Sequence, residues 1–204
     1  IVAARATVGA VALAPDAVNL GQDTALDFDG FAKGVAVDAC VRRLRERGLR
    51  RALVNFGESS IYALGTPPDA SAWVLDVRGP DPDSLVARLR LRDEAASVSA
   101  VYGALGRHAA GDVGHIVDPR SGRPLAEDVV GIVVAPTAAR AEALSKAVLV
   151  WGESGVARVE HIGGVRAARI TRAGLARGAR MRKARALVAF DRPRPLEGAE
   201  AALR

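Results

Sequence analysis

The sequence predicts an α+β fold, and three observations lead to that class. Strand-like segments follow one another through short turns rich in Gly, Pro and Asp. Helical periodicity is confined to a few segments and does not alternate with single strands, as a doubly wound sheet would require. Half of the 204 residues are hydrophobic and only 4% are aromatic, so the core is expected to consist of small, closely packed side chains.

The first half of the chain is predicted to hold one helix between hairpins. Residues 5–13 and the AVNL segment at 17–20 are expected to form an antiparallel pair closed by the PDA turn. Apolar side chains then recur at helical spacing over residues 30–48, on a face expected to bury Cys40. Three strands are expected after this helix, at 51–57, 59–65 and 72–78.

The second half is predicted to form strands around one long helix. The segment TAARAEALSKAVLVWG is the strongest helix candidate, with an apolar stripe of Ala141, Leu144, Val148 and Trp151. The remaining segments are expected to be strands at 84–92, 95–102, 115–125, 128–136 and 164–172, a flexible connection at 107–112 and a short helix at 154–160.

Charge is concentrated toward the C-terminus. The formal net charge is +6, and residues 172–194 hold eight Arg or Lys residues against the single acid Asp191. Such a segment either attracts nucleic acid or an anionic membrane surface, or is a solvated strand or tail. Aromatic side chains do not interleave with the basic ones, and no nucleic-acid-binding module is recognisable. The solvated segment is therefore favoured, and no nucleic-acid partner is expected.

Membrane spans and disulfide frameworks are not expected. No run of 18 or more uncharged apolar residues is present in the sequence. The first residues, IVAARATVGA, lack the order of a signal peptide, and their strand-like start leads us to expect further natural sequence upstream. The single cysteine excludes an internal disulfide and a thiolate metal cluster.

The segment LDFDGFAKG places two acids and two glycines at the start of the first predicted helix. A helix N-terminus offers free N–H groups and a partial positive charge, and Lys33 adds a mobile cation for a phosphate. Gly30 and Gly34 let a ligand approach the backbone closely. The segment is neither a Walker loop nor a GxGxxG fingerprint, so an ordinary helix start with acidic capping is an equal alternative.

A second unusual segment, HIVDPRSGRP, places a histidine and an aspartate three residues apart at the end of a predicted strand. DPRSG fits a type I turn that begins at Asp118. Asp118 therefore either holds the turn or takes part in chemistry. His115 is one of three histidines, and its spacing alone does not make it catalytic.

Five segments together resemble one known family. LDFDGFAKGVAVD, LVNFGESSIYALG, SVSAVYG, HIVDPRSGRPL and AEALSKAVLVWG occur in the order and spacing of the FAD:protein FMN transferases, the ApbE-type flavin transferases. The resemblance covers about residues 8–160. It implies an α+β fold with an antiparallel sheet core flanked by helices. The implied organisation is a flavin transferase domain at 1–172 that lacks the family's upstream part, followed by a basic strand or tail at 173–204.

The resemblance also implies an enzyme with defined partners. Members of the family bind FAD and Mg²⁺, cleave the pyrophosphate, and attach FMN to a Thr or Ser hydroxyl of an acceptor protein with release of AMP. The implied partners are thus a flavin nucleotide and an acceptor protein. By similarity, Asp27, Lys33 and Ile116 correspond to nucleotide-binding positions. His115 corresponds to a histidine beside the reacting phosphates, and it forms the candidate catalytic pair with Asp118.

The implied metal site departs from the family's pattern. The carbonyl of Gly30 corresponds to a metal ligand, but Glu142 and Lys146 replace the family's Asp and Thr ligands on the late helix. Glu142 still offers oxygen, whereas a charged Lys146 has no lone pair and repels a cation. Lys146 is a hypothetical replacement for part of the cation's charge, and Asp29 a hypothetical replacement ligand. Alternatively, Glu142 and Lys146 form a structural i, i+4 ion pair.

Further substitutions leave two functional hypotheses. The family's NLGGD is replaced by residues 55–59 (NFGES), and its ATSG by residues 97–100 (SVSA). The leading hypothesis is a FAD:protein FMN transferase-like enzyme that depends on Mg²⁺. The alternative is a non-catalytic relative that binds a flavin nucleotide or serves as a scaffold.

Overall fold

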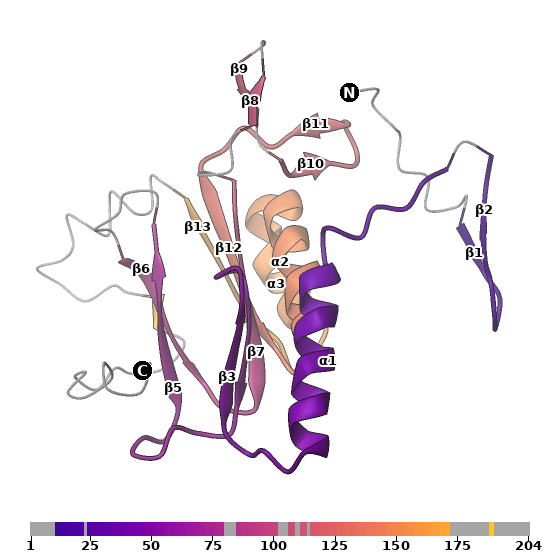
Figure 1. Ribbon diagram of the computed structural model, residues 1–204. Helices are drawn as coiled ribbons and strands as arrows, with labels where there is room; N and C mark the ends of the chain where they lie inside the picture. The colour runs from indigo at the N-terminus through magenta and orange to yellow at the C-terminus, as the bar shows by residue number, and fades with distance from the viewer. Residues whose placement is uncertain are drawn as a thin grey trace, which may run out of the picture.

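The computed structural model has a layered architecture built on a central antiparallel sheet (Figure 1). The structure describes residues 11–22, 24–79, 85–101, 106–108, 111–113, 115–171 and 188–189. Helices cover one face of the central sheet, and a smaller sheet covers the other face. The α+β class predicted from the sequence is confirmed.

The central sheet has five described strands in the order β13-β12-β7-β4-β3, and each neighbouring pair is antiparallel. All residues of β12 are buried, as expected for the strand with the longest run of β-branched side chains. Its residue Ile132 pairs with Val98 on one side and Ala168 on the other. The strands are β3 Ala52–Phe56, β4 Ser60–Leu64, β7 Glu94–Ala100, β12 Val129–Ala135 and β13 Arg166–Thr171.

The smaller sheet packs on the central sheet through an apolar cluster. It has the order β14-β6-β5, in which β6 is antiparallel to β5 and parallel to β14. Leu89 and Leu91 of β6 are fully buried and belong to one hydrophobic cluster with Ile132 of the central sheet. The strands are β5 Trp73–Arg78, β6 Leu85–Leu91 and β14 Val188–Ala189.

Short hairpins of the described chain lie outside both sheets. The β1–β2 hairpin projects away from the helices, whereas β8–β9 and β10–β11 lie at the upper end of the molecule in Figure 1. Pairing of β8 with β9 contradicts the flexible connection predicted at 107–112. The strands are β1 Val11–Leu13, β2 Val18–Leu20, β8 Gly106–His108, β9 Gly111–Val113, β10 Val117–Asp118 and β11 Arg123–Pro124.

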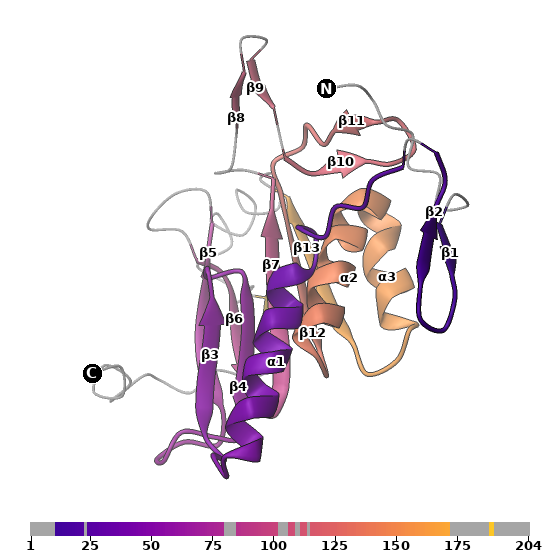
Figure 2. The same cartoon turned by 45° about the vertical axis from the view of Figure 1, so that its right-hand side comes forward.

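The helices lie side by side on the face of the central sheet opposite the smaller sheet (Figure 2). The two long helices run antiparallel, because the start of α2 lies beside Asp38 of α1 and its next turn lies beside Gly34. Both helices match the segments predicted from periodicity. The helices are α1 Ala32–Glu46, α2 Ala138–Trp151 and, after a turn of 3-10 helix at Gly152–Ser154, α3 Gly155–Glu160.

Two side chains of the helices lie elsewhere than predicted. Cys40 is exposed, because Val37 and Val41, one turn apart, form the buried line of α1 and Cys40 lies to its side. Trp151, the last residue of α2, is also exposed. Its ring instead lies under the guanidinium of Arg158 in α3, 5.4 Å from the ring centroid.

The predicted basic segment at 173–204 lies outside the described residues, apart from β14. The domain boundary expected at residue 172 therefore stays a prediction. Among the described helices, none combines the length and the apolar character needed to cross a membrane.

Candidate functional site

A buried carboxylate forms the centre of a polar cluster between α1 and α2. Glu142 lies on the side of α2 that faces the start of α1, and its side chain is 0% exposed. Its Oε2 accepts a hydrogen bond of 2.5 Å from the backbone N–H of Gly34. Its Oε1 lies 3.2 Å from Nζ of Lys146 and 3.6 Å from Nζ of Lys33. The carboxylate is thus enclosed by one amide and two ammonium groups.

The two lysines of this cluster reach solvent, unlike the carboxylate between them. The side chain of Lys33 is 39% exposed and that of Lys146 is 28% exposed. Lys33 also donates a 2.6 Å hydrogen bond to Oγ of Ser59, at the hairpin between β3 and β4. Burial lowers the pKa of Lys146, Glu142 acts in the opposite direction, and the charge of Lys33 lowers that pKa further.

Buried serine hydroxyls continue the polar cluster beneath α2. Oγ of Ser145 lies 2.7 Å from Oγ of Ser99 and 3.1 Å from Oγ of Ser97. Ser145 also donates to the backbone carbonyl of Glu142 at 2.9 Å. Ser60 pairs with Ser97 across the strands, and its fully buried Oγ has no hydrogen-bond partner among the described residues. We call these four serines the serine seam.

The start of α1 is fixed against the start of α2 by a close backbone contact and a cap. A Cβ on Gly34 would lie 2.5 Å from the carbonyl oxygen of Ala138, so only glycine fits there. The expectation that a ligand approaches the backbone at Gly34 is therefore wrong, because α2 fills that space. One turn later, Asp38 accepts the N–H groups of Ala138 and Ala139 at 2.7 and 3.0 Å. This cap from another helix satisfies two otherwise free donors of α2.

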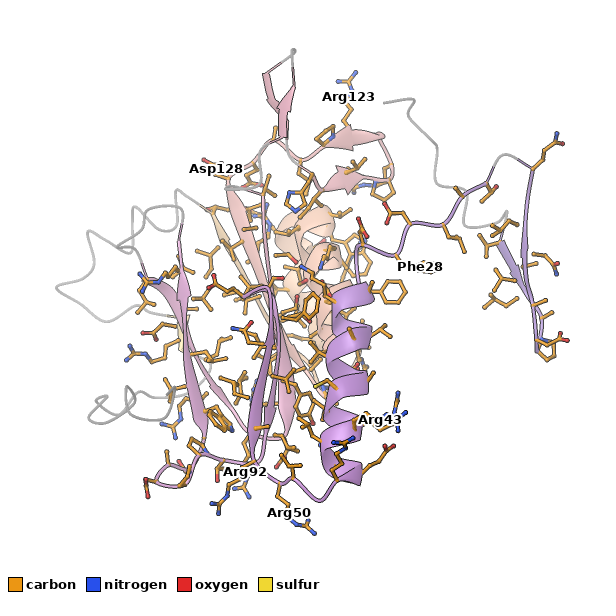
Figure 3. The ribbon with its side chains drawn as sticks, viewed as in Figure 1. Phe28, Arg43, Arg50, Arg92, Arg123 and Asp128 are labelled. Carbon is orange, nitrogen blue, oxygen red and sulfur yellow. The ribbon has the colours of Figure 1, made fainter. Side chains whose placement is uncertain are left out.

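The segment that leads into α1 is open to solvent. Asp27 accepts the backbone N–H of Asp29 at 2.8 Å, and both carboxylates are exposed. Around Gly30 no atom lies within 4 Å of the position that a Cβ would take. Phe28 lies beside the start of α1, on the side away from the sheet (Figure 3), with its ring edge-to-face on Phe31. A ligand has access to the backbone at Gly30, in contrast to Gly34.

The segment at 115–125 lies beside the other end of α2. His115 is exposed, whereas Ile116 is 7% exposed and packs in a cluster with Leu149 of α2. Asp118 accepts three side-chain bonds and a backbone bond from Arg120, which lower the pKa of its carboxyl group. Arg120 donates in turn to the carbonyl of Val150 at 2.8 Å. Asp118 thus holds the turn, and Arg120 ties that turn to α2.

Three segments far apart in the sequence therefore meet along α2. The start of α1 contacts α2 at Glu142, the β3–β4 hairpin contacts Lys33, and the 115–125 segment packs on the last turn of α2. The same arrangement is visible in Figure 2, where β10 and β11 lie over the end of α2 beside the start of α1. Two hollows of about 450 and 380 Å³ lie elsewhere, around Arg45 in the last part of α1.

The described residues do not fit a divalent cation at this cluster. Both oxygens of Glu142 are engaged by the Gly34 amide and the ammonium groups of Lys33 and Lys146. A charged ammonium offers no lone pair to a metal. No group of three His, Cys, Asp or Glu residues in the described part of the chain is placed to hold a metal ion. Participation of the Gly30 carbonyl stays a prediction.

Sequence reasoning missed several residues that build the cluster. Asp38 follows Gly34 by one helical turn, which places both on one face of α1, and this spacing was a usable signal. Ser97 and Ser99 alternate along one strand, which places both on one face of the sheet. The contacts of Ser59 and Ser145 carry no comparable signal in the sequence.

Comparison with known proteins identifies relatives of one kind. Residues 1–168 match the model of the ApbE family. The FAD:protein FMN transferase of Rhodobacter capsulatus is 32% identical over 143 residues, which cover 70% of this chain and 27% of that protein. The protein of the same name in Escherichia coli K12 is 26% identical over 155 residues, which cover 74% of this chain and 44% of that protein.

Solved structures show the same fold. The apo flavinyl transferase ApbE of Pseudomonas stutzeri superimposes with a TM-score of 0.67 at 26% identity, over 80% of this chain and 51% of that one. The ApbE protein of Thermotoga maritima gives a TM-score of 0.72 at 23% identity, over 81% and 55% of the two chains. This chain spans less than half the length of the two curated relatives above and about half the length of these structures.

Proposed function

The chain belongs to the ApbE family, and on that premise we propose that it acts in transfer of FMN from FAD to a protein. In the proposed reaction, the hydroxyl oxygen of a Thr or Ser on the acceptor protein attacks the phosphorus of the FMN half. A new P–O bond forms, the pyrophosphate bond breaks, and AMP leaves with the bonding electron pair. The hydroxyl proton passes to a base, and His115 is the candidate.

The observation that carries this proposal is the meeting of three motif segments along α2. Lys33 at the start of α1 and the turn that follows His115 both contact this helix, although about 80 residues separate them in the sequence. Phosphoryl transfer requires fixed positive charge beside the phosphates and an aligned hydroxyl. The ammonium groups of Lys33 and Lys146 supply charge of that kind at one place.

The remaining site residues take roles that agree with their surroundings. Asp27 is exposed next to the open backbone at Gly30, so it is accessible to the nucleotide. The buried side chain of Ile116 anchors the backbone beside His115. Asp118 positions the turn that follows through its bonds with Arg120. We therefore assign Asp118 a positioning role rather than a direct one.

Mass spectrometry tests the proposed function directly. The protein is incubated with FAD and a folded acceptor protein that carries one candidate threonine, with EDTA or with a panel of divalent cations. We expect the acceptor to gain the mass of an FMN adduct, with AMP released in equal amount. An acceptor in which that threonine is replaced by alanine is the control. Absence of an adduct under every condition, including with the Lys146→Thr variant, would rule the activity out.

A second candidate function follows from the contacts of the Glu142 carboxylate. Glu142 is fully buried and engaged on both oxygens, as in a purely structural ion pair. This feature favours a non-catalytic relative that binds a flavin nucleotide without transferring it. The two functions differ in outcome: the non-catalytic protein quenches the fluorescence of added FAD but yields no adduct and no AMP.

A further inference from the structure

The site holds its own positive charge where the family resemblance implies a divalent cation. We propose that the cluster of Lys33, Glu142 and Lys146 binds the pyrophosphate group of a dinucleotide without any metal ion, with the Lys146 ammonium in the place of the cation. This inference rests on the proposed function for the choice of ligand. It goes beyond that function by assigning the charge at the site to side chains of this chain.

The carboxylate of Glu142 binds the two lysines and is not available to a metal ion. Oε1 of Glu142 holds both ammonium groups, at 3.2 and 3.6 Å, and Oε2 is bound by an amide. A cation at Glu142 would have to displace these partners from a position with no exposed surface. Coulomb repulsion from two ammonium groups within a few ångströms opposes that displacement. The ammonium groups of Lys33 and Lys146 are therefore both held in place by the carboxylate of Glu142.

The cluster of Lys33, Glu142 and Lys146 carries a net positive charge at a place that solvent reaches. Two ammonium groups around one carboxylate leave a formal charge of +1. An ammonium has three N–H donors, and Lys146 uses one of them, on Glu142, among the described residues. Burial and the charge of Lys33 both lower the pKa of Lys146. An anion bound between the lysines would offset that repulsion and accept the remaining donors.

The serine seam begins one residue after the serine that binds Lys33. Ser59, which binds Lys33, directly precedes Ser60 at the start of β4. The fully buried hydroxyl of Ser60 has no partner among the described residues, which is uncommon for a buried polar atom. A bound phosphate oxygen, directly or through a water molecule, would satisfy such a donor. Ser60 is therefore the candidate hydroxyl donor of the proposed site, next in the chain to the Ser59 that binds Lys33.

Titration calorimetry with two probes tests the metal-free site. FAD carries the full dinucleotide pyrophosphate, and ADP carries a diphosphate without the flavin. Each is titrated into the wild-type protein in EDTA and, separately, in millimolar Mg²⁺. We expect the Kd of each probe to be the same in both buffers within about twofold. A Kd that is measurable only with Mg²⁺ would overturn the inference, as would no binding of either probe.

Substitution of Lys146 provides the sharper test. Lys146→Thr removes the ammonium and places a hydroxyl there, so binding in EDTA should weaken about tenfold through loss of one charge-assisted contact. Mg²⁺ should then restore part of the affinity. Arg43→Thr removes one positive charge at an exposed site in the lower half of α1 (Figure 3) and should leave the Kd unchanged. Wild-type affinity of Lys146→Thr in EDTA would show a structural ion pair only.

Two further measurements distinguish failure of the inference from misfolding of a variant and from failure of the proposed function. Thermal unfolding of each variant shows whether Lys146→Thr is folded, and Lys146→Met, which keeps the aliphatic stem, is the second variant. If neither variant folds, the Kd of each probe for the wild-type protein in EDTA and in Mg²⁺ still tests the inference. Transfer together with a Kd that is measurable only with Mg²⁺ keeps the proposed function and overturns the inference. Metal-free binding without transfer supports the inference and removes the proposed function.

Discussion

The two faces of the central sheet are built from alternate residues of the same strands, yet they differ in chemistry. Toward the smaller sheet, β7 presents Ala96 and Val98, and β12 presents Ile132, in a cluster of apolar side chains. Toward the helices, β7 presents Ser97 and Ser99, next to the fully buried Glu142. The cluster on the first face is apolar throughout, whereas the second face includes both apolar residues and buried serines.

This difference suggests separate roles for the two faces: the face toward the smaller sheet stabilises the fold, and the face toward the helices holds the candidate functional residues. Burial of apolar area stabilises the fold, while a buried carboxylate or hydroxyl is costly unless it is paired. A sequence selected for stability alone would have filled the space beneath α2 with aliphatic side chains, as on the other face. The polar part of the helix face coincides with the place where the start of α1 meets α2 and Lys33 binds the β3–β4 hairpin, while the 115–125 segment packs on the other end of α2. That coincidence supports a functional interpretation of Glu142 and the serine seam.

The largest expected effect is a loss of stability on truncation of a core side chain on the apolar face. Ile132→Ala leaves a cavity between the two sheets at a fully buried position and should lower the free energy of unfolding by about 3–4 kcal/mol. Ile132→Val is the matched smaller deletion, with an expected loss of about 1 kcal/mol. Urea denaturation measures both. FAD affinity of the folded protein should not change; a loss of affinity would mean that the two faces are coupled.

The sequence predicted the elements of both faces better than their chemistry. Periodicity placed α2 within a residue of Ala138–Trp151, because Thr137 caps its first turn and Gly152 ends it. Alternation predicted the strand at the end of 84–92, and apolar runs predicted the strands at 51–57 and 128–136. Local pattern suffices for these strands, since their own residues show the apolar character that the apolar cluster requires.

The candidate site was predicted only as a set of motif segments. The Gly34–Glu142 hydrogen bond joins residues 108 positions apart, and no local pattern encodes such a contact. Spacing alone indicated an i, i+4 ion pair for Glu142 and Lys146; the pair is present, and its carboxylate is also bound by the amide of Gly34 in α1. Resemblance to the family brought the segments together, and only the fold shows how they contact one another.

A smaller effect is expected where the two helices are joined. Asp38→Ala removes the acceptor of two N–H groups at the start of α2 and should lower the free energy of unfolding by about 2 kcal/mol. Asp38→Asn keeps one side-chain oxygen and should lose about half as much. Urea denaturation with both variants tests the cap. An equal loss in both would point to the charge of Asp38 rather than to the hydrogen bonds.

A change of opposite sign is expected in the serine seam. Ser60→Ala removes a buried hydroxyl that has no partner among the described residues, so stability should rise by about 1 kcal/mol. Ser99→Ala removes a hydroxyl bonded to Ser145 and should lower it by about 1 kcal/mol. FAD affinity of Ser60→Ala should fall about threefold if the hydroxyl serves a ligand. Loss of stability in both variants would mean that Ser60 has a partner in the folded protein.

The smallest effect is expected at an ion pair outside both faces. Arg88 binds Asp76 on the outer side of β5–β6, and its hydrogen bonds lower the pKa of Asp76 below 3.8. Because the folded-state pKa is the lower one, this pair stabilises the protein above pH 3.8, and the contribution is lost as the pH falls through the folded-state value. Partial exposure limits the contribution to roughly 0.5 kcal/mol.

Denaturation of Asp76→Asn and wild type as a function of pH measures this contribution. The difference in unfolding free energy should be constant well above pH 3.8 and should vanish toward lower pH. Arg88→Gln should give the same profile, and the double variant should lose no more than either single one. FAD affinity should be unchanged in all three, because the pair lies on the far side of the apolar cluster from Lys33 and Lys146. A change in affinity would contradict the separation of stability and chemistry between the two faces.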